Sequence, residues 1–412
     1  MITQLTDLMK TLGGLLIPLL LCCQAGDAQT NETKAPCGAD VMFRRFLPDN
    51  TERTEARMVV EKNIRQYLRG TSGPHFRSEI VVPVVVHIVW FKEEENVSDE
   101  IIFSQIEALN RDFLAENGDL SRVPQEFKGR VASTGIRFCL AARTPDGSAT
   151  SGIVRVRTDM ADIGLNANLF YTASGGSDAW DTNQYLNIWV ASTGTLLAGF
   201  ASYPGLSEPE KSGVVIHPKY FGINNHKYYG LGRTAVHETG HYFGLIHTWG
   251  DDDLCETDDS IPDTPLQLHA YTGCPDYPQQ SCNESSMFMN FMDYVNDPCM
   301  YMFTEGQKQR IHAVIELYRP GLLHTQIACN EGLSEGSDDF DILPNPAVHD
   351  VTIRFRKLRN TITRYEIYNS TGQLVCSKNL SAEQEFTISV DQLPRGIYAI
   401  KIQSQSHILI KI

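Results

Sequence analysis

The chain is short of positive charge and of long apolar runs. It has 35 Lys and Arg against 50 Asp and Glu, which gives a formal net charge of -15 and a pI near 5.2. No basic patch interleaved with aromatic residues occurs, although such a patch is typical of nucleic-acid-binding proteins. Beyond the first residues, no apolar stretch approaches the roughly 20 residues that a bilayer-spanning helix needs. The sequence therefore predicts neither a nucleic-acid partner nor a transmembrane segment.

The cysteine pattern lacks the C-x-x-C pairs that are typical of a four-thiolate zinc site. Eight of the ten cysteines follow Ala28, and four of these form a cluster made of Cys255, Cys274, Cys282 and Cys299. In an exported chain we expect such cysteines to form disulfides. Four cysteines allow three pairings, and their spacing does not choose among them.

The N-terminus predicts export. Lys10 precedes an apolar run over residues 12–21 that is too short to cross a membrane, and small residues then offer a cleavage site. We expect a signal peptide over residues 1–28. Cys22 and Cys23 leave a lipid anchor as the alternative, although the large side chain before Cys22 disfavours that processing.

The stretch from His237 to His247 has the form H-E-x-x-H-x-x-G-x-x-H. His237 and His241 are four residues apart, so a helix places both imidazoles on one face at the spacing of zinc ligands. Glu238 lies beside the first ligand, where it can act as a base toward a water at the metal. Gly244 can end the helix in a left-handed turn, after which His247 supplies a third nitrogen. Three protein ligands leave one coordination position open, which is typical of a catalytic zinc site.

Three alternatives use part of this pattern. A buried helix could carry hydrogen-bonded histidines, and a binding protein could keep the zinc as a structural ion. Glu238 argues against the structural ion, because such a site needs no base. A metal-dependent hydrolase acting on an amide of a small molecule is the third alternative.

The long motif resembles that of the metzincin metallopeptidases, and nearby segments are similar to those of the pappalysin family. Asn290-Phe291-Met292-Asp293-Tyr294 resembles the methionine turn of that family, with Met292 below the metal. Residues 263–267 resemble its D-T-P-x-Q loop. Further similar segments are a backing helix at 106–113 and strands at 186–191 and 213–216. The resemblance spans roughly residues 80–320 and implies an α+β fold, in which a twisted mixed sheet carries a backing helix and an active-site helix.

The resemblance also implies a function and several site residues. We expect a secreted zinc endopeptidase that acts on proteins, with Tyr294 stabilising the oxyanion and an edge strand within residues 194–204 pairing with the substrate. The implied disulfides are Cys255–Cys282 and Cys274–Cys299. Enzymes of this kind cut before Arg or Lys, and Asp297 is our candidate for the carboxylate that selects those residues, although it could instead only cap a turn.

An acidic loop over residues 251–259 has two interpretations. It is either a solvated loop or a calcium site built from carboxylate and carbonyl oxygens, although no EF-hand spacing is present. The resemblance favours calcium, with Asp258, Asp259 and Thr264 as the matched positions. A bound calcium would stiffen the loop beside the zinc site.

Cys37 lies between the expected signal peptide and the first strand. A thiolate is a good fourth zinc ligand, and Gly38 would let the backbone approach the cleft closely. The resemblance implies that Cys37 holds a zymogen inactive, whereas the alternative is a disulfide with Cys139, Cys329 or Cys376. If the enzyme resembles its relatives in this, self-cleavage falls at Glu52–Arg53 or Ala56–Arg57. The same stretch also predicts a surface helix over residues 54–68, and the two expectations are compatible.

Alternating strand patterns with turn residues fill the C-terminal part. The ordered segments Leu343-Pro344-Asn345-Pro346, 367–373 and 393–398 resemble the C-terminal sorting domain of the Bacteroidetes type IX secretion system. We expect a β-sandwich of about seven strands, and a carbohydrate-binding sandwich is the alternative. The predicted order is a signal peptide (1–28), a pro-segment (29–56), a peptidase domain (57–330), a linker (331–340) and a sorting domain (341–412), with a monomeric mature enzyme.

Secondary structure can be expected at a few further positions. Residues 79–91 are rich in β-branched side chains and predict a strand, and Pro83 within it predicts an edge strand or a bulge. Ser98 should begin a helix that runs to about Leu114. Thr304 and Gln307 fit a capping box for a helix that ends before Pro320.

Overall fold

The computed structural model describes residues 37–38, 50–70, 79–250, 254–325, 327–330, 340–355, 363–380, 385–402 and 405–412. The expected signal peptide and its lipid-anchor alternative lie outside the described residues. The same holds for most of the pro-segment, for Asp251 to Asp253 and for nearly all of the expected linker. No helix of the described part is long and apolar enough to cross a membrane.

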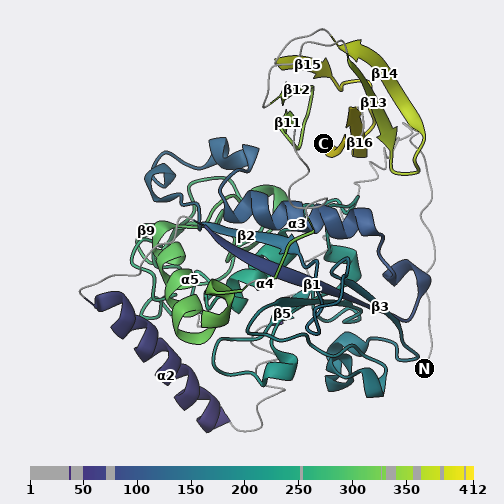
Figure 1. The fold of residues 1–412 in the computed structure, drawn as a ribbon. Coiled ribbons are helices and arrows are strands. Elements are labelled where there is room, and N and C mark those ends of the chain that lie inside the picture. Colours follow the sequence, from purple (N-terminus) through teal and green to yellow (C-terminus); the bar gives the residue numbers. More distant parts are fainter. Residues whose placement is uncertain are drawn as a thin grey trace, which may run out of the picture. The chain divides into compact units, whose positions relative to one another are not determined.

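A mixed sheet forms the framework of the N-terminal domain (Figure 1). Its strands follow the order β2-β1-β4-β6-β5, and β3 pairs with the far half of β1 beyond β2. All pairings are parallel except that of β5, which runs antiparallel to β6 at the edge of the sheet. The bounds are Ile80–Trp90 for β1, Ile136–Leu140 for β2, Ile153–Arg157 for β3, Leu186–Ala191 for β4, Gly199–Ala201 for β5 and Val214–Ile216 for β6.

Pro83 does not mark an edge, which corrects the expectation from the sequence. Strand β1 is central, because β2 and β3 flank it on one side and β4 on the other. The amides of Ile80 and Val86 bond toward the β2 and β3 side, so the nitrogen of Pro83 points to the β4 side. Pairing with β4 begins only at Val84, and the missing N–H of Pro83 therefore costs no ladder hydrogen bond.

Two helices cover one face of this sheet. Helix α3 (Asp99–Phe113) begins after Ser98, as expected, and helix α4 (Arg233–Tyr242) carries the first two histidines of the motif. The main core joins alternate β1 residues to apolar residues of both helices, among them Val82, Val84, Ile88, Ile106, Leu109, Ala235 and Val236. Segments around residues 163–170 cover the other face and pack on Trp189. Because both faces are buried, β1 is almost continuously apolar instead of alternating.

Two further helices pack beside this layer. Helix α5 (Glu305–Tyr318) starts at the Thr304 capping box, in which Thr304 Oγ1 accepts from the Gln307 amide and the Gln307 side chain accepts from the Thr304 amide. Helix α2 (Asn50–Arg69) is longer than the helix expected over 54–68, and Figure 1 shows it beside α5. The expected boundary between pro-segment and peptidase domain at residue 56 therefore falls inside a continuous helix.

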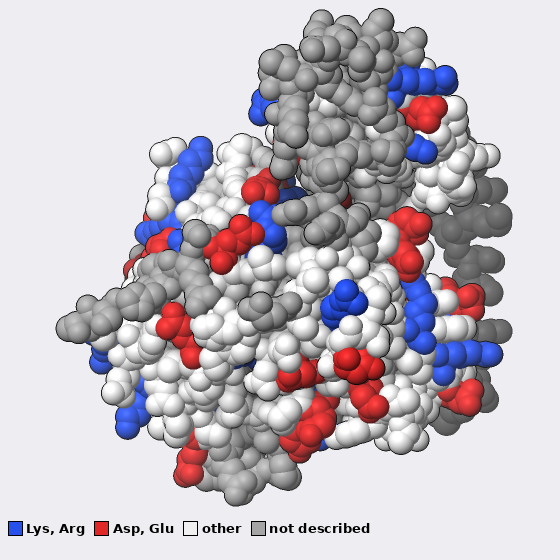
Figure 2. All heavy atoms as spheres, viewed as in Figure 1, with Lys and Arg blue, Asp and Glu red and all other residues white. Residues whose placement is uncertain are grey.

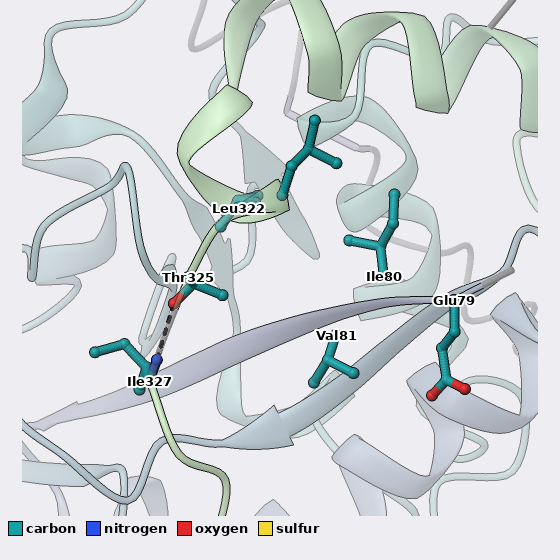
Figure 3. A pocket seen from close by; sticks show the side chains of 7 residues that line it. Glu79, Ile80, Val81, Leu322, Thr325 and Ile327 are labelled. Atoms are coloured by element: carbon teal, nitrogen blue, oxygen red, sulfur yellow. Dashed lines mark hydrogen bonds between the residues drawn. The ribbon is translucent and has the colours of Figure 1, made fainter. Parts of the chain in front are cut away.

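Three disulfides staple this domain. Cys255–Cys282 joins two parts of the loop after α4, Cys274–Cys299 joins that loop to the segment after the methionine turn, and Cys139–Cys329 ties β2 to the end of the domain. The loop holds short strand pairs, namely β7 (Thr272–Gly273) with β10 (Tyr294–Val295), and β8 (Gln280–Ser281) with β9 (Glu284–Ser285). A pocket of about 150 Å³ lies beside the start of β1, and Figure 3 shows Leu322, Thr325 and Ile327 on its wall. Its lining contains no residue of the zinc motif.

The C-terminal part is an all-β domain with its own core, built around Phe340, Val351, Ile367 and Ile400. Seven strands in the described residues of this domain form antiparallel sheets in the orders β11-β12-β15 and β14-β13-β16-β17, which confirms the predicted sandwich of about seven strands. The strands are β11 (Phe340–Leu343), β12 (Asp350–Phe355), β13 (Thr363–Asn369), β14 (Leu374–Leu380), β15 (Glu385–Ser389), β16 (Gly396–Ile402) and β17 (Gln405–Lys411).

On the molecular face drawn in Figure 2, the described Lys and Arg side chains are scattered among Asp and Glu, without a continuous basic patch.

Candidate active site

Three imidazoles converge at the end of α4. The Nε2 atom of His241 lies 3.1 Å from Nε2 of His237 and 3.0 Å from Nε2 of His247. Helix geometry brings the first two together, and Gly244 turns the chain back with a φ of 82° so that His247 reaches them. All three histidines are buried. Three imidazole nitrogens that face one point are the arrangement that a zinc ion needs.

Backbone carbonyls orient two of these rings. Nδ1 of His237 lies 2.7 Å from the carbonyl oxygen of Phe291, and Nδ1 of His241 lies 2.8 Å from that of Leu245. A carbonyl can only accept, so each Nδ1 carries the hydrogen and each Nε2 keeps a lone pair for a metal. The residues present therefore fit zinc by their tautomers as well as by their placement.

Met292 lies directly beneath the zinc-binding helix. A Cβ added to Gly240 would stand only 2.5 Å from the Sδ atom of Met292, so any larger residue there would displace the Met292 side chain. Met292 is fully buried, and its amide donates to the side chain of Asn290 within the turn. Met292 therefore packs against Gly240, which lies between the two histidines of the helix, and its role below the metal stays a prediction.

Cys37 reaches the same point from the N-terminal segment. Its Sγ and the ligand nitrogens of His237, His241 and His247 all lie within 4.8 Å of one another. The thiol also lies 3.4 Å from Oε2 of Glu238. Cys37 is buried and belongs to none of the three disulfides, so the disulfide alternative for Cys37 is not the arrangement found.

The edge strand β5 runs alongside this segment. The Gly38 amide donates to the Gly199 carbonyl at 2.7 Å, and Cys37 forms a parallel bridge with Gly199. A Cβ on Gly38 would stand 2.4 Å from Leu197 Cδ1, so glycine permits this close approach. Residues 37 and 38 therefore pair with the strand edge that the sequence predicts for substrate.

Aromatic rings line the outer side of the histidines. The Tyr294 ring centroid lies 4.9 Å from that of His247 and 5.7 Å from that of His237. Trp249 stacks on His247 with centroids 4.4 Å apart and planes 5° apart. Trp249 is not among the residues predicted for the site, although its position two residues after the last ligand is a usable signal.

Asp293 is part of the methionine-turn segment, and its sequence gives no sign of the bonds that its carboxylate makes. Its carboxylate accepts hydrogen bonds from the amides of Tyr294 and Tyr271, from the Gln267 side chain at 2.7 Å and from Thr248 Oγ1 at 3.3 Å. Burial raises the pKa of Asp293 to about 6, against the lowering effect of these donors. Asp293 therefore ties the D-T-P-x-Q loop, the segment after His247 and the methionine turn into one unit.

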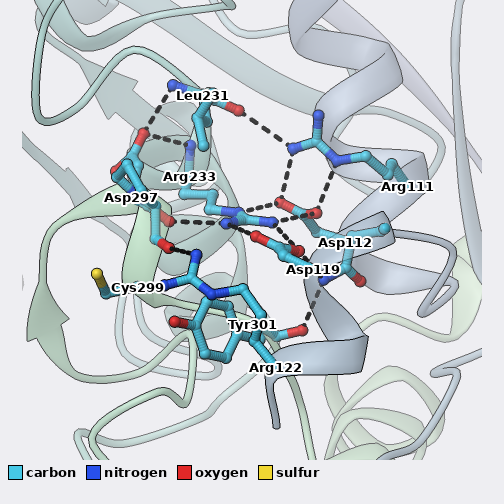
Figure 4. Close-up of polar contacts among 12 residues, drawn as sticks. Arg111, Asp112, Asp119, Arg122, Leu231, Arg233, Asp297, Cys299 and Tyr301 are labelled. Carbon is cyan, nitrogen blue, oxygen red and sulfur yellow. Dashed lines mark hydrogen bonds and ion pairs between the residues drawn. The ribbon is translucent and has the colours of Figure 1, made fainter. Parts of the chain in front are cut away.

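A buried ionic cluster fixes the start of α4 (Figure 4). Arg233, the first residue of the helix, pairs with Asp112 of α3 at 3.0 Å and with Asp119 at 2.7 Å. Burial alone would raise the pKa of Asp112, but the positive charges of Arg111 and Arg233 outweigh it and lower that pKa. This cluster was not predicted, because Arg233 is more than 100 residues away from Asp112 and Asp119 in sequence.

Asp297 joins the same cluster from the other side. Its carboxylate Oδ2 accepts from the amides of Leu231 and Arg233, and its carbonyl accepts from the Arg233 guanidinium. Asp297 is fully buried and is the first residue of the short 3-10 helix Asp297–Cys299. The role of Asp297 in substrate choice stays a prediction.

The acidic loop brings together only part of the expected calcium set. Asp259 is buried and its Oδ1 accepts from Thr264 Oγ1 at 2.7 Å, whereas Asp258 is exposed and caps the Ser260 amide. Burial raises the pKa of Asp259 to about 8. Its other oxygen accepts no hydrogen bond from the part of the chain that the structure describes.

Comparison with known proteins agrees with this geometry. Residues 173–316 match the peptidase family described as pregnancy-associated plasma protein-A. A mutant of Tannerella forsythia promirolysin is 36% identical, with a TM-score of 0.65 over 73% of this chain and 99% of its own. Mature mirolysin of the same organism, in complex with a cleaved peptide, is 39% identical, with a TM-score of 0.55 over 60% of this chain and 99% of its own.

This chain belongs to the pappalysin family of metallopeptidases. An extracellular metalloprotease of Arthroderma benhamiae is also similar, with 27% identity over 255 residues that cover 59% of this pappalysin and 75% of the fungal protein. The family and the histidine cluster together make the protein a zinc metalloprotease whose substrates are proteins. The prediction of an α+β metzincin fold is confirmed.

The C-terminal domain of this pappalysin matches a different family from the peptidase domain. Residues 341–412 match the secretion system C-terminal sorting domain, as the ordered turn segments predicted. A sorting domain of this kind implies export by the type IX system, and the similar proteases are extracellular. The enzyme is therefore secreted or displayed at the cell surface.

Proposed function

We propose that this pappalysin is exported as a latent zinc endopeptidase whose activity is blocked by Cys37. The observation that carries the proposal is the convergence of Cys37 Sγ with the three histidine nitrogens within 4.8 Å. A thiolate in the fourth ligand position would exclude the water that hydrolysis needs. The pairing of Gly38 with Gly199 would at the same time cover the strand edge that an extended substrate would use.

Activation would follow removal of this segment. Zinc, when bound by His237, His241 and His247, supplies a Lewis acid that makes water a nucleophile near neutral pH and polarises the scissile carbonyl. Glu238 takes the proton of the attacking water and later delivers it to the leaving amine. Tyr294 lies beside His237 and His247 and donates a hydrogen bond to the developing oxyanion.

Substrate choice would depend on Asp297. A carboxylate at the base of the pocket for the residue after the scissile bond would attract Arg or Lys. Its position, five residues after Met292 and at the start of the zinc-binding helix, supports this role. With that preference the enzyme would process itself before Arg57, and before Arg53, whose side chain is not described. The mature enzyme would act as a monomer.

Calcium would stabilise the loop beside the site. Asp259 is a buried carboxylate with one oxygen left over by the described residues, and Thr264 lies against its other oxygen. A hard cation that takes oxygen ligands fits this environment, because it would offset the cost of burying the negative charge.

The block of the zinc site by Cys37, called the Cys37 latch below, is tested with a precursor that begins at residue 29. Wild type, Cys37→Ala and Cys376→Ala are followed by the lag before they cleave a quenched peptide. Cys376 is the matched control, because it lies in the sandwich and outside the three disulfides. We expect Cys37→Ala to act without a lag and Cys376→Ala to behave as wild type. An unchanged lag in Cys37→Ala would reject the latch.

A further inference from the structure

Two buried arginines hold the carboxyl end of the zinc-binding helix. The last carbonyls of a helix have no partner within it, so they need donors from elsewhere. Arg310 of α5 donates its Nε to the Gly244 carbonyl at 2.6 Å, and Arg319 donates to the Tyr242 carbonyl at 3.1 Å. Helix α5 thereby braces the turn that separates the second zinc ligand from the third.

The carbonyl that Arg310 contacts, that of Gly244, directly precedes the carbonyl that orients the zinc ligand His241. The carbonyl of Leu245, the residue after Gly244, is the acceptor for Nδ1 of His241. The Leu245 amide in turn donates to Gly240, below which Met292 lies. A displacement of the Gly244 peptide would therefore rotate the His241 ring and shift the backbone that leads to His247.

The counter-charge of Arg310 comes from α2. Oε1 of Glu61 lies 2.5 Å from the Arg310 guanidinium, and Tyr203 Oη lies 2.7 Å from that oxygen and 2.9 Å from the guanidinium. Arg310 is almost completely buried, so loss of Glu61 would leave a charge inside the protein with its ion pair broken. Burial would raise the pKa of Glu61, but the charge of Arg310 outweighs it and lowers that pKa.

The packing of α2 agrees with a lasting role. Val60 and Ile64 are buried against Ala313 and Val314 of α5, in a cluster that also contains Leu206. This apolar face follows directly after Arg57, the expected self-cleavage position. A cut before Arg57 would therefore release the Cys37 segment and leave the docked part of α2 attached.

We propose that Glu61 and Arg310 are positioning residues of the mature enzyme, and that α2 acts as a brace for the zinc site through them. Glu61 fixes the guanidinium of Arg310, and Arg310 fixes the peptide that precedes the acceptor of His241. The brace requires that activation cut on the N-terminal side of Glu61. It rests on the zinc metalloprotease activity and is independent of the Cys37 latch.

The test uses self-processed enzyme and three readouts, namely kcat, KM and the rate at which zinc is lost to a chelator. Glu61→Gln removes the negative charge and keeps the shape of the side chain. Arg310→Lys keeps the positive charge but loses the planar guanidinium, which donates to several acceptors at once. We expect Glu61→Gln to release zinc about ten-fold faster and to lower kcat about ten-fold, the usual size of effects around metal ligands, with KM nearly unchanged. Arg310→Lys should change the rate of zinc release and kcat in the same directions, but by less than Glu61→Gln does.

The matched control is Asn63→Ala. Asn63 lies on the same helix and donates to Tyr318 of α5 at 3.1 Å, so its loss weakens the α2–α5 contact without touching Arg310. If Glu61→Gln and Asn63→Ala release zinc at the same rate, the brace is wrong and the ion pair serves only stability.

Two further measurements keep the proposal open to rejection if Glu61→Gln does not fold. Tyr203→Phe removes a hydroxyl that contacts Glu61, Arg310 and the Gly244 carbonyl itself, so it loosens the same peptide, and it should accelerate zinc release several-fold relative to Asn63→Ala. The N-terminus of the mature enzyme should lie before Glu61, and a fully active enzyme that begins after it would overturn the proposal. Failure of the latch would leave these results unaffected, because zinc release is compared with wild type.

Discussion

The carboxylate of Asp297 accepts a hydrogen bond from the amide of Arg233, the first residue of the zinc-binding helix, at 3.2 Å. The residue before Arg233 is a glycine in the left-handed region and has no side chain with which to cap the helix. Asp297 therefore takes the place of a capping side chain from 64 positions away, and its negative charge faces the positive end of the helix dipole.

Asp297→Asn separates this capping role from a role in substrate choice. If Asp297 selects basic residues, the preference for Arg or Lys after the scissile bond should fall at least about ten-fold, since a charge-assisted contact is lost. Cleavage sites are read by mass spectrometry of a digested protein. The control is Asp276→Asn, which removes an exposed carboxylate. A lowered Tm with an unchanged preference would leave Asp297 as a helix cap only.

Asp259→Asn tests calcium. Without a cation, a carboxyl whose pKa is raised to about 8 is mostly protonated at pH 7, so the nearly isosteric Asn should be tolerated. With calcium bound, the carboxylate is ionised and contributes a ligand. We expect added calcium to raise the Tm of wild type by several degrees and that of Asp259→Asn much less. If added calcium leaves the Tm of wild type unchanged, the proposed calcium site at Asp259 is wrong.

His87 predicts a pH dependence of stability outside the active site. It is fully buried on β1, lies between Ser177 and Asn187 and stacks on Trp189. Burial lowers its pKa to about 4, although the Asn187 bond and the Asp178 charge act in the opposite direction. The unfolded chain therefore binds more protons than the folded chain between about pH 4 and pH 6.5. The His87 contribution is fully present above about pH 6.5 and is lost as the pH falls toward 4.

The size of this effect is on the order of 3 kcal/mol, since each pKa unit corresponds to about 1.4 kcal/mol. The measurement is the difference in Tm between pH 7.5 and pH 5. His87→Gln keeps a polar side chain but cannot titrate, so we expect a smaller difference than in wild type. Equal differences in the two proteins would show that His87 does not titrate as its burial requires.

Local patterns predicted those parts of the fold that short spacing decides. The four-residue spacing of His237 and His241, the turn at Gly244 and the capping box at Thr304 each depend on a few neighbouring residues. The alternating strands of the sandwich are local for the same reason.

Contacts between distant segments were not predictable in this way. Pro83 suggested an edge because a proline cannot donate to a neighbouring strand, but where β4 begins depends on the whole sheet. Arg233 meets Asp112, and Arg310 meets Glu61, across 121 and 249 positions. No spacing rule links such pairs, so a sequence shows the ligands of the site but not what holds them in place.

The most direct test of the account compares wild-type and Glu238→Ala precursors, beginning at residue 29, in the presence of a denatured protein. Glu238 follows the first zinc ligand, its Oε2 lies 3.4 Å from the Cys37 thiol, and it is the base assigned to the reaction. Mass spectrometry should show that wild type trims itself and cuts the protein, that a chelator stops both, and that Glu238→Ala keeps its zinc but does neither. Undiminished cleavage by Glu238→Ala would contradict the account.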